Sequence, residues 1–233
     1  LCLQQGIEED DCNTDVFNPA WVVKPADGSK VIDELSKIAS QLLDKKGVEA
    51  DITKVASLGW SGGSQVAAAL AGAKRNLSST VQISSKDDRV LAGVVLSPQG
   101  PSFAGYYETE EGTSMDTVDV PLFVSTGEND LKPTNDLLLP SIRRKTFDNL
   151  PDGGGHRLLY SLLPVGTGGH GTYQLGDQDS ADEQLNRFSQ ALISGVLAFL
   201  DMHLSGSDAA ASYLDSANVL ALAGKSQAEW TKK

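Results

Sequence analysis

The sequence has few of the residues that bind metals, cross-link chains or contact polyanions. Its 233 residues include two cysteines and three histidines, and 31 acidic residues against 19 basic ones give a net charge of −12. Because a strongly acidic chain is repelled by nucleic acid, we expect no nucleic-acid partner. Neither Cys2 nor Cys12 has a histidine at metal-ligand spacing, so no metal site is predicted. The two thiols either close a small disulfide loop or stay unpaired.

Long apolar runs and a basic leader segment are also lacking. A membrane-spanning helix needs roughly 20 apolar residues in a row, and the longest candidate, 191–204, contains Ser194, Asp201 and His203. We therefore expect no membrane span. No basic segment followed by an apolar one opens the chain, so no signal peptide is predicted. The chain starts at Leu1 without an initiator methionine, which leaves a mature, a trimmed and a partial product open.

The chain does contain short apolar runs that alternate with amphipathic segments, and it is long enough for one large core. The predicted strands are 54–58, 91–96, 120–125 and 157–165, and the predicted helices are 29–46, 65–72 and 183–204, with a further helix and a tail in 208–233. Apolar strands separated by helices are typical of an α/β protein with a mainly parallel sheet flanked by helices. We expect a single α/β domain over residues 1–233, with an irregular segment at 1–28.

The clearest motif is Gly59-Trp60-Ser61-Gly62-Gly63, which lies between an apolar strand and a helix of small residues. In that context G-x-S-x-G predicts a nucleophile elbow, a strained turn that lifts the serine hydroxyl clear of the sheet. We expect both flanking glycines to be required because a Cβ there would clash with the neighbouring strand and helix. The alternative is a glycine-rich turn in which Ser61 only caps the following helix.

An activated serine needs a base and an acid that orients the base. In the α/β-hydrolase order the acid comes next along the chain, on a loop after a strand. The strand 120–125 runs into such a loop, where Asp130 is the predicted acid and Glu128 is the competing choice. In the alternative interpretation both are ordinary loop carboxylates, with Asp130 making an Asx-turn.

The predicted base is His170, which lies in a glycine-rich loop after the strand 157–165. His156 precedes that strand, at the wrong end of a parallel sheet for the same site. His203 lies near the end of the long helix, where contacts with helix-end carbonyls are expected. The order Ser61, Asp130, His170 therefore matches the order of a hydrolase triad.

Further site residues are predicted around Ser61. The backbone N–H of Gly62 is the expected first donor to a negatively charged oxygen of the intermediate. A second donor normally comes from a loop after an earlier strand, and the residues before the strand 54–58 show no such loop. Trp60 and Tyr106 are the candidate substrate-pocket residues. The alternatives are that Trp60 is a packing residue and that Tyr106 belongs to a surface loop.

Taken in order, these stretches resemble the C-terminal two-thirds of bacterial α/β-hydrolases of the dienelactone hydrolase and platelet-activating-factor-acetylhydrolase-like group. The resemblance covers roughly residues 20–233 and rests on 24–27, 58–63, 96–101, 126–130, His170 and 229–230. It implies an α/β-hydrolase fold with Ser61 as nucleophile, Asp130 as acid and His170 as base, and no metal or organic cofactor. Such proteins begin with further strands and an oxyanion loop. The resemblance therefore implies N-terminal strands that are missing here or lie on a separate polypeptide of the same protein.

The function predicted from these residues is that of a serine hydrolase, a serine carboxylesterase-type enzyme that cleaves a small-molecule or lipid-like ester through an acyl-enzyme. Relatives of this kind include carboxylesterases, phospholipid acyl hydrolases and polyester hydrolases, so a lipid, polyester or thioester substrate is an alternative. They are usually secreted or periplasmic, which is the predicted location. A second alternative is a non-catalytic hydrolase-like binding or structural subunit.

Overall fold

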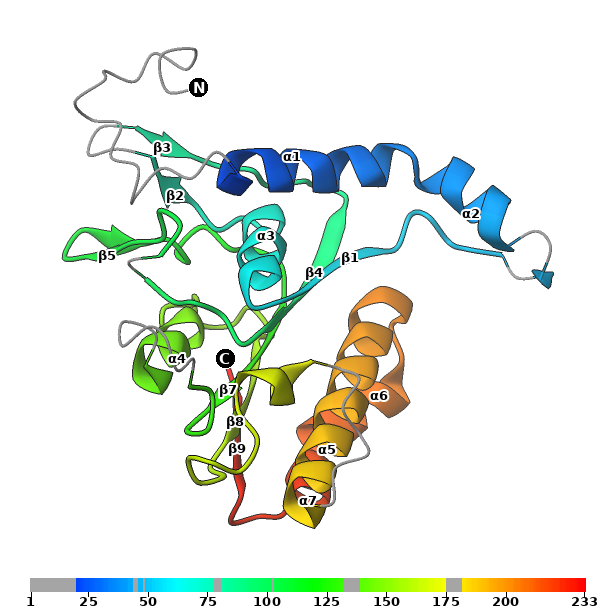
Figure 1. The fold of residues 1–233 in the computed structure, drawn as a ribbon. Coiled ribbons are helices and arrows are strands. Elements are labelled where there is room, and N and C mark those ends of the chain that lie inside the picture. Colours follow the sequence, from blue (N-terminus) through cyan, green and yellow to red (C-terminus); the bar gives the residue numbers. More distant parts are fainter. Residues whose placement is uncertain are drawn as a thin grey trace.

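The computed structural model describes residues 20–43, 46–47, 49–77, 81–101, 103–131, 139–174 and 182–233. The centre of the fold is a five-stranded sheet with the order β1-β4-β7-β8-β9 (Figure 1). Its first four strands are parallel, and β9 is antiparallel to β8. The bounds of these strands are Val55–Trp60, Val90–Leu96, Leu122–Gly127, Arg157–Ser161 and Ala228–Lys232. The predicted α/β class with a mainly parallel sheet is therefore confirmed.

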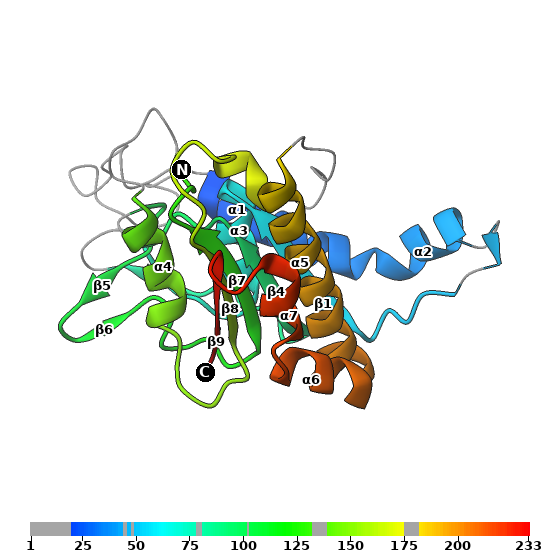
Figure 2. The same ribbon diagram turned by 90° about the horizontal axis from the view of Figure 1, so that it is seen from below.

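Helices cover both faces of the sheet (Figure 2). The core on one face lies under α5, α6 and α7, and the edge-to-face ring pair of Phe123 and Phe199, with centroids 5.7 Å apart, lies within it. The core on the other face includes Ala67 of α3 and Phe147 of α4. The bounds of these helices are Glu183–Leu200, Asp208–Asp215, Asn218–Ala223, Gly62–Leu70 and Pro140–Asp148.

The three inner strands, β4, β7 and β8, are therefore buried on both faces. In β7 all six residues are buried, and in β4 six of seven are. Such strands are read from sequence as continuous apolar runs, which is why they were predictable. Because parallel strands end at the same edge of a sheet, the residues that follow β1, β4, β7 and β8 meet at that edge. This edge carries the candidate site.

The N-terminal part of the described chain differs from the prediction. Helix α1 spans Ala20–Asp33, so residues 20–28 are helical rather than irregular, and α2 follows separately at Leu35–Leu43. Pro25 lies inside α1, where proline normally disfavours a helix. Helix α1 packs closely on α3: a Cβ at Gly28 would lie 2.9 Å from a methyl carbon of Leu70. Tertiary packing thus overrides the local helix propensity.

The C-terminal part also differs from the expected helix and tail. It forms α6, α7 and the strand β9, and Trp230 of β9 donates from its indole N–H to the carbonyl of Leu214. The long helix α5 matches the prediction and continues into a π-helical turn, η5, at Asp201–Ser205. The tail was not recognised as a strand because it has only five residues and lies at the edge of the sheet, where few contacts shape its sequence.

Within the described residues one helical stretch, Glu183–Ser205, is long and apolar enough to cross a membrane by length and composition alone. Part of its apolar side chains, among them Phe188 and Phe199, belongs to the core against the sheet, whereas Leu197 is exposed. Core helices of globular proteins pass the same test of length and composition. The absence of a membrane span therefore stays a prediction.

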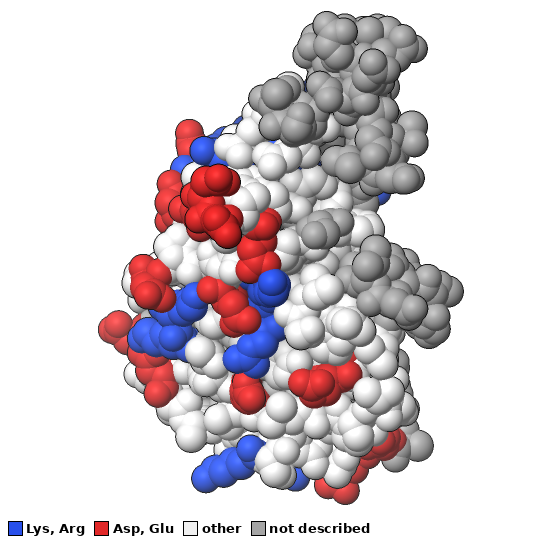
Figure 3. All heavy atoms as spheres, turned by 90° about the vertical axis from the view of Figure 1, so that its left-hand side faces the viewer, with Lys and Arg blue, Asp and Glu red and all other residues white. Residues whose placement is uncertain are grey.

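Two further pairs of short antiparallel strands lie outside this sheet. Strands β2 and β3 pair at Arg75–Asn76 and Gln82–Ile83, and strands β5 and β6 pair at Glu108–Thr109 and Gly112–Thr113. The face of the molecule in Figure 3 carries basic and acidic side chains intermixed, despite the net negative charge. Exposed ion pairs of this kind contribute at most about 1 kcal/mol each.

A buried histidine gives the fold a predictable response to pH. His156 is fully buried, and its Nδ1 accepts the backbone N–H of Leu122 at 3.0 Å. Burial lowers the pKa of His156 to about 4, and the nearby cations Lys233 and Arg157 act in the same direction. Between pH 6.5 and 4 the unfolded chain binds a proton at this histidine that the folded chain does not. The free energy of unfolding therefore falls as the pH falls through this window.

We expect the titration of His156 to lower the free energy of unfolding by about 2–3 kcal/mol when the pH is lowered from 7 to 4.5. In the His156→Asn variant this contribution disappears, because asparagine does not titrate, while its amide oxygen can still accept the N–H of Leu122. Urea unfolding of both proteins at the two pH values measures it. Equal losses of stability on acidification in both proteins would contradict the prediction.

Candidate active site

Ser61 lies on a sharp turn between β1 and α3. Its backbone has φ +54° and ψ −121°, a conformation that non-glycine residues adopt only at a cost of about 1–3 kcal/mol. Its N–H donates to the carbonyl of Leu96 at 2.9 Å, which ties the turn to the neighbouring strand β4. The Ser61 side chain makes no capping hydrogen bond to α3. The interpretation of Ser61 as only a helix cap is therefore wrong.

The two glycines that flank the motif are not equivalent. A Cβ at Gly59 would lie 2.0 Å from the carbonyl oxygen of Gly63, so the turn closes only if residue 59 has no side chain. A Cβ at Gly63 would meet nothing within 4 Å. The prediction that glycine is required is therefore confirmed for Gly59. It is wrong for Gly63, because a side chain there would extend into open space.

We expect Gly59→Ala to displace Ser61 and reduce any Ser61-dependent activity at least 100-fold, because a backbone clash cannot be relieved by a side-chain rotation. The matched change Gly63→Ala should preserve the fold and stabilise it by about 0.5–1 kcal/mol, because alanine favours the helix. Thermal unfolding and labelling of Ser61 with a fluorophosphonate measure both effects. Equal labelling of the two variants would contradict the prediction.

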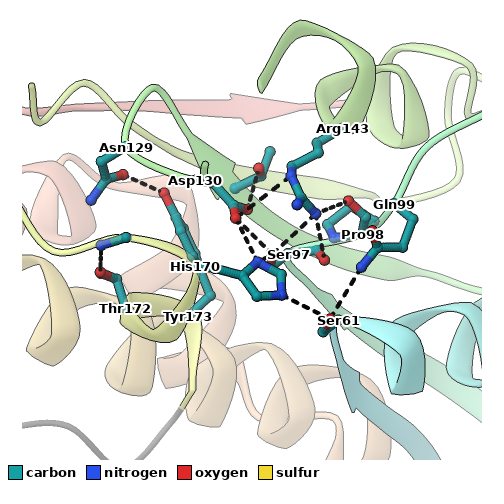
Figure 4. Close-up of polar contacts among 12 residues, drawn as sticks. Ser61, Ser97, Pro98, Gln99, Asn129, Asp130, Arg143, His170, Thr172 and Tyr173 are labelled. Carbon is teal, nitrogen blue, oxygen red and sulfur yellow. Dashed lines mark hydrogen bonds and ion pairs between the residues drawn. The ribbon is translucent and has the colours of Figure 1, made fainter. Parts of the chain in front are cut away.

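His170 bridges Ser61 and Asp130 (Figure 4). Its Nε2 lies 2.7 Å from the Ser61 hydroxyl oxygen, and its Nδ1 lies 2.9 Å from Oδ1 of Asp130. Because a carboxylate only accepts, Nδ1 carries the ring proton and Nε2 accepts the hydrogen of the Ser61 hydroxyl. The structure thus brings together the three residues predicted from the sequence.

The carboxylate of Asp130 is fully buried and accepts hydrogen bonds from several groups. Thr126 donates to Oδ2 at 2.8 Å, and Ser97 donates to Oδ1 at 2.9 Å. Glu128, the competing acid, is exposed and accepts from the hydroxyl of Tyr160 at 2.8 Å. The structure therefore places Asp130 and not Glu128 against the imidazole of His170.

The loop of His170 is braced from two sides. Asn129 donates to the carbonyl of Thr167 at 2.8 Å and accepts from the hydroxyl of the buried Tyr173 at 2.6 Å. Thr172 accepts the N–H of Gly169 at 2.9 Å, just before the short 3₁₀ helix η4 (His170–Tyr173). These contacts hold the imidazole of His170 in place relative to the loop after β7, which carries both Asn129 and Asp130.

Arg143 and Ser97 were missed in the sequence. The guanidinium of Arg143 is fully buried, with its Nε 3.6 Å from Oδ1 of Asp130, and it donates to the carbonyl of Pro98 at 2.8 Å. Burial lowers the pKa of Arg143, and the charge of Asp130 opposes that shift. The Ser97 hydroxyl lies 2.7 Å from Nδ1 of His170, and its backbone has φ +48°. Nothing in the local pattern around Arg143, on α4, marks it as a partner of Asp130.

Trp60 supports His170 directly. Its indole N–H donates to the backbone carbonyl of His170 at 3.0 Å. The centroids of the Trp60 and His170 rings lie 4.9 Å apart. Tyr106, the other predicted pocket residue, is 3% exposed, and its hydroxyl donates to the carbonyl of Gln65 at 2.6 Å. Tyr106 is therefore a core residue in this structure rather than an exposed wall of a pocket. It belongs to the same core as Ala67 of α3 and Val95 of β4, a long-range packing that the sequence did not reveal.

The predicted oxyanion donor Gly62 is the first residue of α3. The N–H groups of a helix's first turn have no partner within the helix, and the helix dipole favours negative charge there. Within the described residues no three His, Cys, Asp or Glu side chains are grouped so that they could hold a metal ion. Cys2 and Cys12 lie outside the described residues.

No known protein-family model and no curated protein sequence matches the chain. A hydroxyl that donates to an imidazole, which in turn donates to a buried carboxylate, can lose its proton as it attacks an electrophilic carbon. The positive end of α3 lies where negative charge would develop in such an attack.

Proposed function

We propose that the protein is a serine hydrolase that cleaves carboxylic esters through an acyl-enzyme. The observation that carries the proposal is the continuous chain of hydrogen bonds from Ser61 through His170 to Asp130. The strained turn that presents Ser61 at the start of α3 supports it further, because a strained backbone is retained mainly where it serves a function. The finer fold assignment, an α/β-hydrolase fold, is part of this proposal.

In the proposed mechanism His170 takes the proton of Ser61 at Nε2 while Oγ attacks the carbonyl carbon of the ester. The electron pair of the carbonyl bond moves onto its oxygen, which the N–H of Gly62 stabilises. The intermediate then collapses, the alkoxide leaves with the proton from His170, and an acyl-Ser61 remains. Asp130 holds the imidazole in the required tautomer and stabilises the imidazolium.

Deacylation repeats these steps with water as the nucleophile. His170 accepts a proton from water, the hydroxide oxygen bonds to the acyl carbon, and the Ser61–acyl bond breaks as Ser61 regains its proton. No metal is needed for either half of the reaction, because the imidazole provides all proton transfers.

Ester hydrolysis by the wild-type chain tests the proposal. We expect turnover on p-nitrophenyl acetate, butyrate, octanoate or palmitate, with the chain-length optimum reporting the size of the acyl site. A fluorophosphonate should add to the protein once, and peptide mapping should place the adduct on Ser61. Absence of both turnover and adduct would favour the alternative of a non-catalytic binding subunit. Thioester and amide analogues of the best ester then separate the rival acyl-transfer reactions.

A further inference from the structure

Gln99 contacts Ser61 from the side of β4, and the mechanism above gives it no role. It lies in the turn that follows β4 and is 2% exposed. Its amide nitrogen lies 3.1 Å from Oγ of Ser61 (Figure 4). Its amide oxygen is buried and has no hydrogen-bond partner among the described residues. Within the described part of the chain, the hydrogen bond that this buried amide makes is therefore the one to the hydroxyl of Ser61, the proposed nucleophile.

The orientation of the Gln99 amide follows from the protons around Ser61. The Ser61 hydroxyl donates its single hydrogen to Nε2 of His170, so its oxygen can only accept from a second partner. Gln99 must then present its NH₂ group to Ser61. The amide is a donor aimed at the atom that attacks the substrate.

Three features hold the backbone of Gln99 in place. Ser97 has φ +48° and Gly100 has φ +73°, so the chain turns sharply on both sides of Gln99. A Cβ at Gly100 would lie 2.2 Å from the carbonyl oxygen of Ile142. Arg143 donates to the carbonyls of Ser97 at 3.2 Å and Pro98 at 2.8 Å. The donor is thus positioned before any substrate arrives, which is the condition for electrostatic catalysis.

We propose that the side-chain amide of Gln99 is the second donor to the negatively charged oxygen of the tetrahedral intermediate, beside the N–H of Gly62. When Oγ gives its proton to His170 and one electron pair to the ester carbon, it becomes an uncharged oxygen, a weaker hydrogen-bond acceptor than the negatively charged oxygen that forms beside it. The N–H of Gln99 then shifts to this stronger acceptor, which is separated from Oγ by two covalent bonds. This role rests on the proposed ester hydrolysis, and it gives the intermediate a second donor beside the N–H of Gly62.

The test compares Gln99→Met, which keeps the length of the side chain but removes the donor, with wild type. We expect kcat to fall roughly 100-fold with little change in KM, the effect of losing one oxyanion donor. The inhibition constant of an alkyl boronic acid should rise by a similar factor, because its adduct with Ser61 mimics the intermediate. Gln99→Glu should be at least as impaired, because a carboxylate repels the developing charge.

Gln227→Met is the matched control. Gln227 also has a buried amide oxygen without a hydrogen-bond partner in the described part of the chain. It lies just before β9, and its backbone carbonyl accepts the N–H of Leu162. This control should keep wild-type kcat. If Gln99→Met does not fold by circular dichroism, Gln99→Ala, which only removes atoms, takes its place.

The outcomes separate this inference from the proposed function. If the wild type hydrolyses esters and Gln99→Met stays within twofold of it in kcat, Gln99 is no oxyanion donor while the hydrolase proposal stands. A change confined to KM would assign Gln99 to ground-state binding and overturn the inference as well. If the wild type neither turns over esters nor reacts with the fluorophosphonate, the hydrolase proposal fails and the role of Gln99 fails with it.

Discussion

Replacing Ser61 by alanine is expected to lower kcat on the best ester by about 10⁵–10⁶-fold, the size of effect seen when the nucleophile of a serine hydrolase is removed. The physical reason is that Oγ of Ser61 lies 2.7 Å from Nε2, the ring nitrogen of His170 that can accept a proton. The Ser97 hydroxyl is equally close to His170, but it lies at Nδ1, which carries the ring proton. Activity is measured with the p-nitrophenyl ester that the wild type hydrolyses best. The fluorophosphonate adduct should disappear in the same variant.

Ser125→Ala provides the control for the loss of a buried serine. Ser125 is fully buried in β7, and its hydroxyl donates to the carbonyl of Leu159 at 2.9 Å. This variant should retain ester turnover within about twofold, with a stability loss of about 1 kcal/mol for one hydrogen bond. Retention of turnover in Ser61→Ala would show that hydrolysis arises elsewhere and would remove the acyl-enzyme mechanism.

Replacing Asp130 by asparagine should lower kcat by about 10⁴-fold while leaving the fold intact. Asparagine has the same shape, but its amide group can donate to Nδ1 of His170 and so favours the wrong tautomer. The imidazole would then carry its proton on Nε2 and could not accept the proton of Ser61. Steady-state kinetics and thermal unfolding of the variant measure both parts of the prediction.

Glu128→Gln decides between the two acids that the sequence left open. Glu128 is exposed and contacts Tyr160 rather than His170, so its loss should change kcat by less than about threefold, the scale of an exposed contact. A large loss in Glu128→Gln together with a small one in Asp130→Asn would contradict the role given to Asp130.

The sequence predicted the parts of the site that depend on local order along the chain. The four parallel strands were recognisable as short apolar runs, and in β4, β7 and β8 these runs reflect burial on both faces of the sheet. Ser61, Asp130 and His170 were recognisable because each follows such a strand. Once the strands are parallel, their ends meet at one edge of the sheet, and the topology brings the loops of the three residues to that edge.

Other features of the site depend on residues that meet only in three dimensions. Arg143 reaches Asp130 and the turn of Ser97 from α4, and no local pattern signals a contact between these segments. Gln99 was part of a recognised stretch, but only its 3.1 Å contact with Ser61 gives it a place in the site. Long-range packing positions such side chains, and neither hydrophobic periodicity nor motif spacing along the sequence predicts contacts of this kind.

The sequence by itself determined the class of the fold and the order of Ser61, Asp130 and His170. The reason is that the apolar runs, and the succession of strands and helices along the chain, can be recognised from neighbouring residues. Only the tertiary structure decided that Asp130 rather than Glu128 meets the base, since neighbouring loop carboxylates differ only in direction. Only the tertiary structure showed that Tyr106 lies in the core and that a side chain at position 63 would cause no clash. It also turned residues 20–28 into a helix and the C-terminal tail into a strand, because packing against α3 and β8 outweighs weak local preferences.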